Sequence, residues 1–371
     1  METKKREPLF HITKRATLKN REALIIRLVA IAISLVVCGI ITTMCTGINP
    51  IAVYGSIING AFGSTRKMWI TFQDVSVLLL ISLALTLAFR MRFWNIGGEG
   101  QVLMGGLGAA ACMVILGDKL PNALVIVCMI LASIALGGLW GFIPAICKAK
   151  WNTNETLSTL MMNYIATQLV SYYIILWESP KGSGKIGIIN QDSNVGWLPE
   201  LFGSKYMLCI VTAIIVTIFV YIYINFSKHG YEVRVVGESV KTAQYVGISV
   251  EKVIVRTMIL SGAICGIVGL LLVGSKNHTI TTTITNGQGF TAVMVSWMAK
   301  FNPFTMILTS LLIIFMDRGA GEIATNYGLN QSFADIMTGI ILFFIIGCEF
   351  FINYQIRFRK NSSLAKEEKT C

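Results

Sequence analysis

The sequence is dominated by long apolar blocks, most of them about 20 residues in length. A helix of that length crosses the hydrocarbon core of a bilayer, because each residue adds about 1.5 Å. Ten blocks lie near residues 24–46, 75–90, 97–116, 122–147, 157–177, 206–226, 257–274, 287–299, 304–320 and 333–353. We therefore predict an all-α, polytopic membrane protein of about ten transmembrane helices. The blocks at 75–90 and 287–299 are short, so each either extends at its outer end or forms a broken helix inside the bundle.

Composition excludes a soluble protein. Of the 371 residues, 54% are hydrophobic and only 13% are charged, against about 25% charged residues in soluble domains. The net charge of +12 does not indicate nucleic acid, because the basic residues flank the apolar blocks and accompany no RNA-binding motif. We expect the lipid bilayer, and not nucleic acid, as a partner.

The basic residues also predict the topology. If the N-terminus lies in the cytoplasm, 23 of the 31 Lys and Arg residues fall on the cytoplasmic side, as cytoplasmic loops of membrane proteins require. This gives a basic cytoplasmic N-terminus at 1–23, a transmembrane domain at 24–353 and a cytoplasmic tail at 354–371. Residues 227–256 form a cytoplasmic loop, whereas 47–74, with a short surface helix, 178–205 and the short turn at 321–332 lie outside.

The chain lacks the motifs of an enzyme. Gly182-Ser-Gly-Lys185 resembles part of a nucleotide-binding loop, but Ser179 and Ile186 occupy positions that require Gly and Ser or Thr. No catalytic residues are assigned, and the three scattered histidines and the cysteines without a CxxC pair predict no metal site. We expect no cofactor in this chain, so any ATP must be hydrolysed by another subunit.

A first polar segment, Asn95-Ile-Gly-Gly-Glu-Gly-Gln101, begins an otherwise apolar helix. In one interpretation Asn95 is the N-cap and Glu99 lies favourably in the first turns. In the other, Asn95, Glu99 and Gln101 form a partly unwound segment beside the permeation path, since non-helical backbone within a membrane must face protein or water.

A second polar segment runs from Asn152 to Tyr164. Glu155, Thr159 and Asn163 are spaced by four, which places them on one helix face. Polar groups entering a membrane helix face other helices or water. The stripe therefore predicts either interhelical hydrogen bonds or a substrate path.

The loop at 227–256 contains a short amphipathic helix. Ser239 can cap it, and Gly247 can end it after Tyr245. Its apolar face, with Val240, Ala243, Tyr245 and Val246, packs either against the membrane surface or, as we favour, against another protein. The candidate docking residues are Gly237, Val240, Ala243, Tyr245, Gly247 and Ile248.

Two GxxxG patterns indicate close helix contacts. Gly262 and Gly266 form one pattern, and Gly137 and Gly141 repeat the spacing.

A second segment, Asn286-Gly-Gln-Gly-Phe290, is similar to Gly98-Glu-Gly100 and also lies at the start of a predicted helix. Such an echo is typical of transporters built from two related halves.

These segments, in this order, resemble the permease subunits of bacterial importers for simple sugars, nucleosides and branched-chain amino acids. NIGGEGQ at 95–101, NETLSTLMMNYIA at 154–166 and AQYVGI at 243–248 are most similar to the nucleoside-type permeases. The resemblance extends from about residue 20 to residue 350 and implies a multi-pass protein of the bacterial plasma membrane.

The resemblance implies function and partners. The chain would move a nucleoside or similar polar solute into the cytoplasm, and a sugar or branched-chain amino acid is the alternative. Its partners would be a cytoplasmic ATPase that carries ATP and Mg²⁺, a second homologous permease and an extracytoplasmic solute-binding lipoprotein. An ion-coupled transporter is a further alternative, which would use acids such as Glu99, Glu155, Asp317, Asp335 and Glu349. A membrane enzyme or lipid flippase finds no support in a clustered nucleophile, base or metal set.

Overall fold

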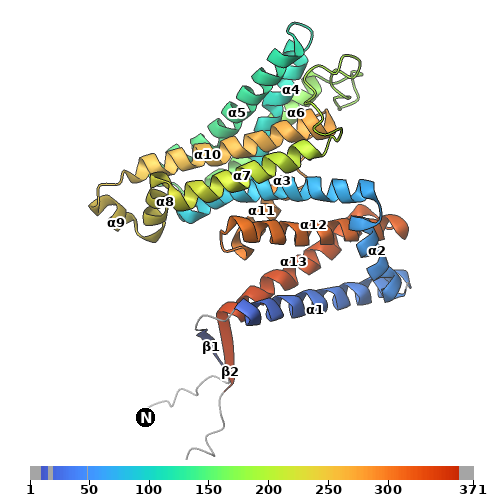
Figure 1. Ribbon diagram of the computed structural model, residues 1–371, viewed down its shortest axis with the longest axis vertical. Coiled ribbons are helices and arrows are strands. Elements are labelled where there is room, and N and C mark those ends of the chain that lie inside the picture. Colours follow the sequence, from blue (N-terminus) through green and yellow to red (C-terminus); the bar gives the residue numbers. More distant parts are fainter. Residues whose placement is uncertain (1–9, 16–19, 48, 359–371) are drawn as a thin grey trace, which may run out of the picture. The chain divides into compact units, whose positions relative to one another are not determined.

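The computed structural model describes residues 10–15, 20–47 and 49–358, so much of the predicted terminal segments 1–23 and 354–371 lies outside the described residues. The elements, drawn in Figure 1, are β1 (Phe10–Lys14), α1 (Asn20–Thr46), α2 (Pro50–Phe62), α3 (Thr65–Arg90), α4 (Gly98–Leu116), α5 (Asn122–Trp151), α6 (Glu155–Leu176), α7 (Met207–Phe226), α8 (Lys228–Glu238), α9 (Val240–Tyr245), α10 (Val250–Leu271), the π-helix η1 (Leu272–Asn277), α11 (Gln288–Met298), α12 (Pro303–Asn326), α13 (Gln331–Asn353) and β2 (Tyr354–Phe358).

The helical membrane architecture is confirmed. In the described part of the chain, nine helices are long and apolar enough to cross a membrane. The tenth block, 287–299, forms only the 11-residue α11, which at about 1.5 Å per residue is too short for a hydrocarbon core of about 30 Å. The other short block, 75–90, extends at its start to Thr65 and becomes the 26-residue α3.

Two predicted loops prove to be largely helical. The segment 47–74 holds the predicted short helix, α2, and also the first turns of α3; Val53 and Ile57 of α2 are buried, whereas Ile51 and Ile58 are exposed. The Ser64 side chain caps α3 by accepting a hydrogen bond from the Lys67 amide. Likewise α12 runs on to Asn326, which leaves only a short turn before α13.

The chain divides into two compact units, whose boundaries fall within α2 and α12. In the unit that holds the described residues up to Gly60 and from Met316, α1 packs against α13 through Ala30, Cys348 and Ile352. In the same unit β1 pairs antiparallel with β2, with Phe10 opposite Phe358. This two-stranded pairing is an addition to the predicted all-α fold.

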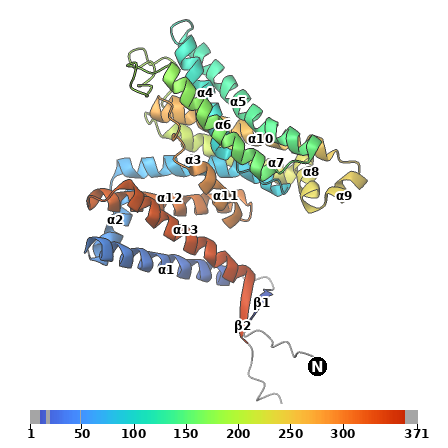
Figure 2. The ribbon, with the colours of Figure 1, turned by 180° about the vertical axis from the view of Figure 1, so that it is seen from behind.

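The second unit, residues 61–315, contains α3 to α11. In the most apolar stretch of its helix α3, 94% of the residues are buried. The helix is therefore surrounded by protein, which explains why it is apolar on all sides. The segment between α6 and α7 lies at one end of this unit, and α8 and α9 lie at the other, in both views (Figures 1 and 2).

Helix α10 is held against α5 by the two GxxxG patterns. A Cβ atom on Gly137 would come closer than 3.0 Å to the Gly262 carbonyl oxygen, and one on Gly266 would come that close to the Ser133 carbonyl. Gly141 faces Met258 in the same way. The backbones therefore touch directly, which only glycine allows.

Candidate functional site

Two helices of the second unit begin beside each other, at the Glu99 side chain. Glu99 lies in the first turn of α4 and is buried. Its carboxylate accepts a hydrogen bond from the Gly289 amide at 2.9 Å and another from the Thr285 hydroxyl. Gly289 is in the first turn of α11, so the carboxylate occupies the position where a helix N-terminus favours negative charge.

Both helices are preceded by non-helical backbone inside the bundle. Residues 91–97 separate α3 from α4, and α10 passes through η1 and a run of turns before α11 begins. Asn286 and Gly287, with φ of 50° and 72°, set the last turn before α11. Broken helices of this kind are tolerated at membrane depth only where protein or a water-filled cavity covers them. The sequence echo between 98–100 and 286–290 thus marks two helix starts that meet.

Thr159 and Asn163 of α6 hold the non-helical segment before α4. The Asn163 side chain accepts a hydrogen bond from the Gly100 amide and donates one to the Ile96 carbonyl, both at 2.9 Å. Thr159 accepts from the Ile96 amide at 3.2 Å and is itself fully buried. These contacts are the interhelical hydrogen bonds that the polar stripe predicted as one alternative.

Asn95 is not the N-cap of α4. The N-cap position belongs to Gly97, and the buried Asn95 side chain instead accepts a hydrogen bond from the Gly97 amide at 2.9 Å. Gln101 lies beside it, with its amide nitrogen 3.5 Å from the Asn95 oxygen. The buried Gln101 side-chain oxygen finds no hydrogen-bond partner among the residues that the structure describes.

We call Asn95, Glu99, Gln101, Thr159, Asn163, Thr285 and Gly289 the Glu99 cluster. Glu155, the remaining member of the predicted set, lies apart from it. Its carboxylate pairs with Lys148 of α5 at 3.0 Å. Together these two side chains line a cavity of about 250 Å³ next to α8 and α9, which Arg92 and Glu238 also line.

Helix α9 forms as the sequence predicts. Ser239 is its N-cap and accepts a hydrogen bond from the Thr242 amide at 3.2 Å, while Gly247 follows with a φ of 81°. The predicted apolar face is divided, however. Ala243 is fully buried, because it packs with Val236 and Ile248 under the helix.

The other predicted docking residues differ in exposure. Tyr245 is 92% exposed, Val246 56% and Val240 48%. Gly237 instead packs its backbone against Arg90 at the end of α3, and a Cβ atom there would meet the Arg90 carbonyl. The exposed side chains of the predicted apolar face of α9 are therefore Val240, Tyr245 and Val246, which we call the α9 patch.

Residues 68–346 match the family described as branched-chain amino acid transport system / permease component. The chain belongs to this family. The guanosine ABC transporter permease protein NupP of Bacillus subtilis is 30% identical over 92% of this chain and 96% of its own length. NupB of Lactococcus lactis, a nucleoside ABC transporter permease protein, is 26% identical over 88% and 91%. The glucose ABC transporter permease protein TsgB13 of Haloferax volcanii is 25% identical over 86% of each chain.

The family defines the general role of the protein. It is a transmembrane permease subunit of an ABC importer, a multi-pass protein of the plasma membrane. Permease subunits of this family are not enzymes themselves, and the family implies an ATPase partner and other subunits.

An ion pair that the sequence analysis missed fixes α8 of the permease to α10. Arg256 donates a hydrogen bond to the Glu232 carboxylate at 2.9 Å, and His229 lies 3.6 Å from the same group. Burial acts to raise the pKa of Glu232, but the hydrogen bond and charge of Arg256, together with His229, outweigh burial and hold the pKa below its usual value. No sequence pattern links residues 24 positions apart.

A second missed pair lies within the membrane spans of the permease. Lys276 of η1 donates to Asp74 of α3 at 2.7 Å, and the Asp74 side chain is only 7% exposed. Charged groups in a span need a partner and mark functional or structural junctions. The isolated Asp74 at the start of an apolar block was the signal that could have revealed it.

The loop that resembles a nucleotide-binding motif binds one of the permease's own side chains. Glu178 accepts hydrogen bonds from the Gly182 amide at 2.7 Å and the Gly184 amide at 3.0 Å. These bonds lower the pKa of the Glu178 carboxyl.

Metal-ligand side chains do not gather in groups of three or more anywhere in residues 10–15, 20–47 and 49–358.

Proposed function

We propose that this permease imports a nucleoside, with guanosine as the first candidate. The observation that carries the proposal is the similarity to a guanosine permease, which extends over 92% of this chain and 96% of that protein. A second nucleoside permease covers a similar share. Alignment over nearly the whole length includes every segment of the Glu99 cluster and α9.

The Glu99 cluster is the proposed region of the substrate path. Its members lie in α6, in the first turns of α4 and α11, which begin inside the bundle, or in the non-helical backbone just before these two helices. Transporters commonly bind their substrates where discontinuous helices begin. Uncharged amides and hydroxyls predominate in the cluster, and such groups suit a neutral solute that needs hydrogen bonds.

The energy source is proposed to be a separate ATPase that carries ATP and Mg²⁺. With the N-terminus in the cytoplasm, as the distribution of basic residues favours, the six candidate spans before α8 in the described residues return the chain to that side, so that α8 and α9 face the cytoplasm. The α9 patch then supplies an apolar docking surface, and the Arg256–Glu232 pair connects α8 to α10. Closure of the ATPase would move α9 and, through that pair, α10, so that the path opens to the other side.

The proposed assembly has two further components. A second homologous permease would complete the membrane domain, and an extracytoplasmic solute-binding lipoprotein would deliver the solute. Both are inferred from the nucleoside-type permeases that the segments at 95–101 and 154–166 resemble. Glucose is the second candidate substrate, because a glucose permease is 25% identical over 86% of the chain. Branched-chain amino acids are a third, given the family description.

Uptake by the whole complex tests this function. Vesicles that contain the permease and its partner subunits should accumulate radiolabelled guanosine only when ATP is supplied, and unlabelled adenosine should compete where glucose and leucine do not. Competition by glucose or leucine, without competition by nucleosides, would reassign the substrate. Uptake that survives vanadate but disappears with an uncoupler would replace the ATP-driven mechanism by ion coupling.

A substitution in the α9 patch tests the coupling separately. Tyr245→Asp places a charge in the docking surface and should abolish ATP-driven uptake. The matched control, Tyr245→Phe, keeps the aromatic ring and should retain uptake. Because Tyr245 is 92% exposed, neither variant should disturb the fold, whereas substitution of the buried Ala243 would.

A further inference from the structure

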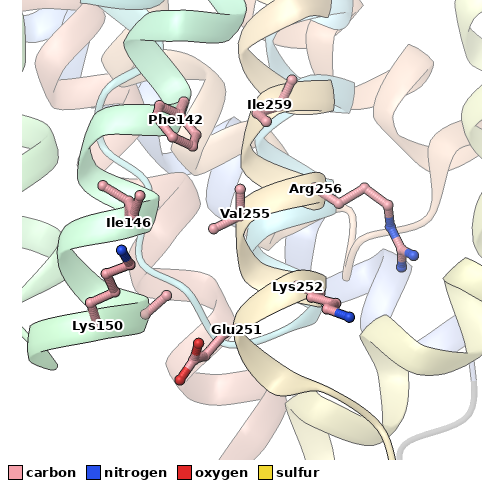
Figure 3. A pocket seen from close by; sticks show the side chains of 9 residues that line it. Phe142, Ile146, Lys150, Glu251, Lys252, Val255, Arg256 and Ile259 are labelled. Carbon is pink, nitrogen blue, oxygen red and sulfur yellow. The ribbon is translucent and has the colours of Figure 1, made fainter.

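A groove lies between the C-terminal turns of α5 and the first turns of α10, at the same end of the unit as α8. Its volume is about 430 Å³, and nine residues line it: Phe142, Ile146, Ala149, Lys150, Glu251, Lys252, Val255, Arg256 and Ile259 (Figure 3). No residue of the Glu99 cluster or of the α9 patch lines this groove. Of its lining residues, only Arg256, through its pair with Glu232, takes part in the transport mechanism described above.

The glycine contacts explain why the groove exists. At Gly141 the backbone of α5 touches that of α10 at Met258. Beyond this point α5 carries Phe142 and Ile146, and α10 carries Val255, so larger side chains replace the glycines. Bulkier side chains hold the two helices apart, which opens the groove toward the helix ends.

The groove has an apolar part and a cationic rim. Along α5, Phe142, Ile146 and Lys150 follow one another at intervals of four residues, on one face of the helix (Figure 3). Along α10, Ile259, Val255 and Glu251 likewise follow one another at intervals of four residues on the face toward α5, and Lys252 lies beside Glu251 on the side of Arg256 (Figure 3). The apolar side chains therefore lie deeper in the membrane spans, and the lysines lie where both spans end.

The rim carries an excess of positive charge. Lys150 and Lys252 are exposed, and the structure shows no ion pair for either of them within the residues that it describes. Glu251, the one acidic residue of the lining, lies between the two lysines (Figure 3), and the charge of Arg256 is already paired with Glu232, so the excess comes from Lys150 and Lys252 alone. A phosphate group at this rim would be attracted by the two lysines.

We propose that this groove binds an anionic phospholipid. The lipid phosphate lies at the rim, where the long Lys150 and Lys252 side chains reach it from the two helices, and an acyl chain lies over Ile146, Phe142, Val255 and Ile259. Charge complementarity fixes the headgroup, since basic pockets between membrane helices bind acidic lipid headgroups. The apolar part of the groove favours a lipid over a free phosphate ion, because an inorganic anion has no apolar surface to bury there. The bound lipid contacts both α5 and α10 beside Arg256. It therefore stabilises the contact between these helices next to the Arg256–Glu232 pair that holds α8.

Lipid retention by the full chain tests the proposal. The permease, assembled with its partner subunits, is placed in bilayer discs of equal parts phosphatidylglycerol and phosphatidylcholine, extracted, and analysed by native mass spectrometry for the lipid that stays bound. The wild-type complex should retain phosphatidylglycerol in preference to phosphatidylcholine. K150Q/K252Q should weaken that retention roughly 30-fold, because each basic side chain near a bilayer contributes about 1 kcal/mol.

Two further variants separate a built site from a basic surface. K228Q/K241Q removes two exposed lysines from α8 and α9 at the same end and should leave retention unchanged. Ile146→Trp fills the groove without altering charge and should reduce retention as K150Q/K252Q does.

Three results would overturn the proposal. The first is an equal loss of lipid retention in both double-lysine variants together with normal retention in Ile146→Trp. The second is an absence of preference for phosphatidylglycerol in the wild type. The third is a crosslink from position 150 to the second permease, which would mean that protein covers the groove. ATP-driven guanosine uptake is measured on the same preparations, so that failure of the lipid site and failure of the proposed substrate are told apart.

Discussion

Glu99 and Gly289 join the starts of two broken helices. The Glu99 carboxylate accepts the Gly289 amide hydrogen bond at 2.9 Å, and a Cβ atom on Gly289 would lie only 2.5 Å from the Glu99 backbone nitrogen. The first turns of α4 and α11 are therefore in direct backbone contact. Movement of either helix start must displace the other, which makes this pair a sensitive point of the proposed substrate path.

Gly289→Ala should damage the permease at this contact. The added methyl group has no space, so it forces α4 and α11 apart, at a cost of about 1–3 kcal/mol typical of overpacking. We expect a lower thermal unfolding midpoint in detergent and a loss of most guanosine uptake. Gly339→Ala in α13 is the control, since nothing lies within 4 Å of its new Cβ atom. Equal behaviour of the two variants would refute the close contact.

Asn163→Leu should release the non-helical segment before α4. The substitution leaves the Gly100 amide and the Ile96 carbonyl without their hydrogen-bond partner. Each buried polar group left unpaired lowers the stability of the fold by about 1–3 kcal/mol. Hydrogen exchange over residues 94–101 should accelerate. Thr167→Val, one turn further along α6, removes only a hydrogen bond to the Asn163 carbonyl and should leave the exchange unchanged. Unaltered exchange in Asn163→Leu would contradict this role.

Neighbouring glycines of α5 should respond differently to alanine. Gly137→Ala would bring a Cβ atom closer than 3.0 Å to the Gly262 carbonyl, whereas the Cβ of Gly138→Ala would meet Ile259 at an ordinary 3.5 Å. We expect Gly137→Ala to destabilise the α5–α10 contact by about 1–3 kcal/mol and Gly138→Ala to be nearly neutral. Thermal unfolding of the two variants in the same detergent measures the difference, and the reverse order would rule out the packing.

The Arg256–Glu232 pair predicts a pH dependence. Because the folded-state pKa of Glu232 is lowered, its stabilising contribution is present above the unfolded value of about 4.3 and is lost as the pH falls through the folded value. Glu232→Gln should therefore lower the unfolding midpoint at pH 7, and the gap to the wild type should shrink below about pH 4. The charged and titratable groups that face Glu232 are Arg256, His229 and Tyr223. A gap that stays constant with pH would contradict the assigned role of the pair.

The sequence predicted most of the spans because their length and apolar character are local properties. The limits of α11 were not predictable in the same way. Its short apolar block could have extended outward, but the helix begins where Gly289 contacts Glu99, 190 residues away. The Asp74–Lys276 pair joins positions 202 residues apart. Contacts of this range leave only indirect marks in a single sequence, such as an isolated acid in an apolar helix.

The site residues show the same division. Spacing placed Thr159 and Asn163 on one face of α6, and the structure brings both to the segment before α4. Spacing could not reveal that Glu155, on the same face, pairs with Lys148 at the helix start. In α9 the cap and the end followed from Ser239 and Gly247. The inward direction of Ala243 depends on packing under α9, which the apolar pattern alone does not specify.

The central claim is that work enters the permease through α9 from a separate ATPase. It is tested most directly by placing the photo-crosslinker p-benzoylphenylalanine at position 245 in the assembled complex. The control is the same substitution at the exposed Tyr172, near the C-terminal end of α6 and so at the opposite end of the unit from α9. We predict an ultraviolet-dependent crosslink to the ATPase from position 245 and none from position 172. A complex that imports guanosine in an ATP-dependent manner but yields no crosslink to the ATPase from position 245 would contradict the account.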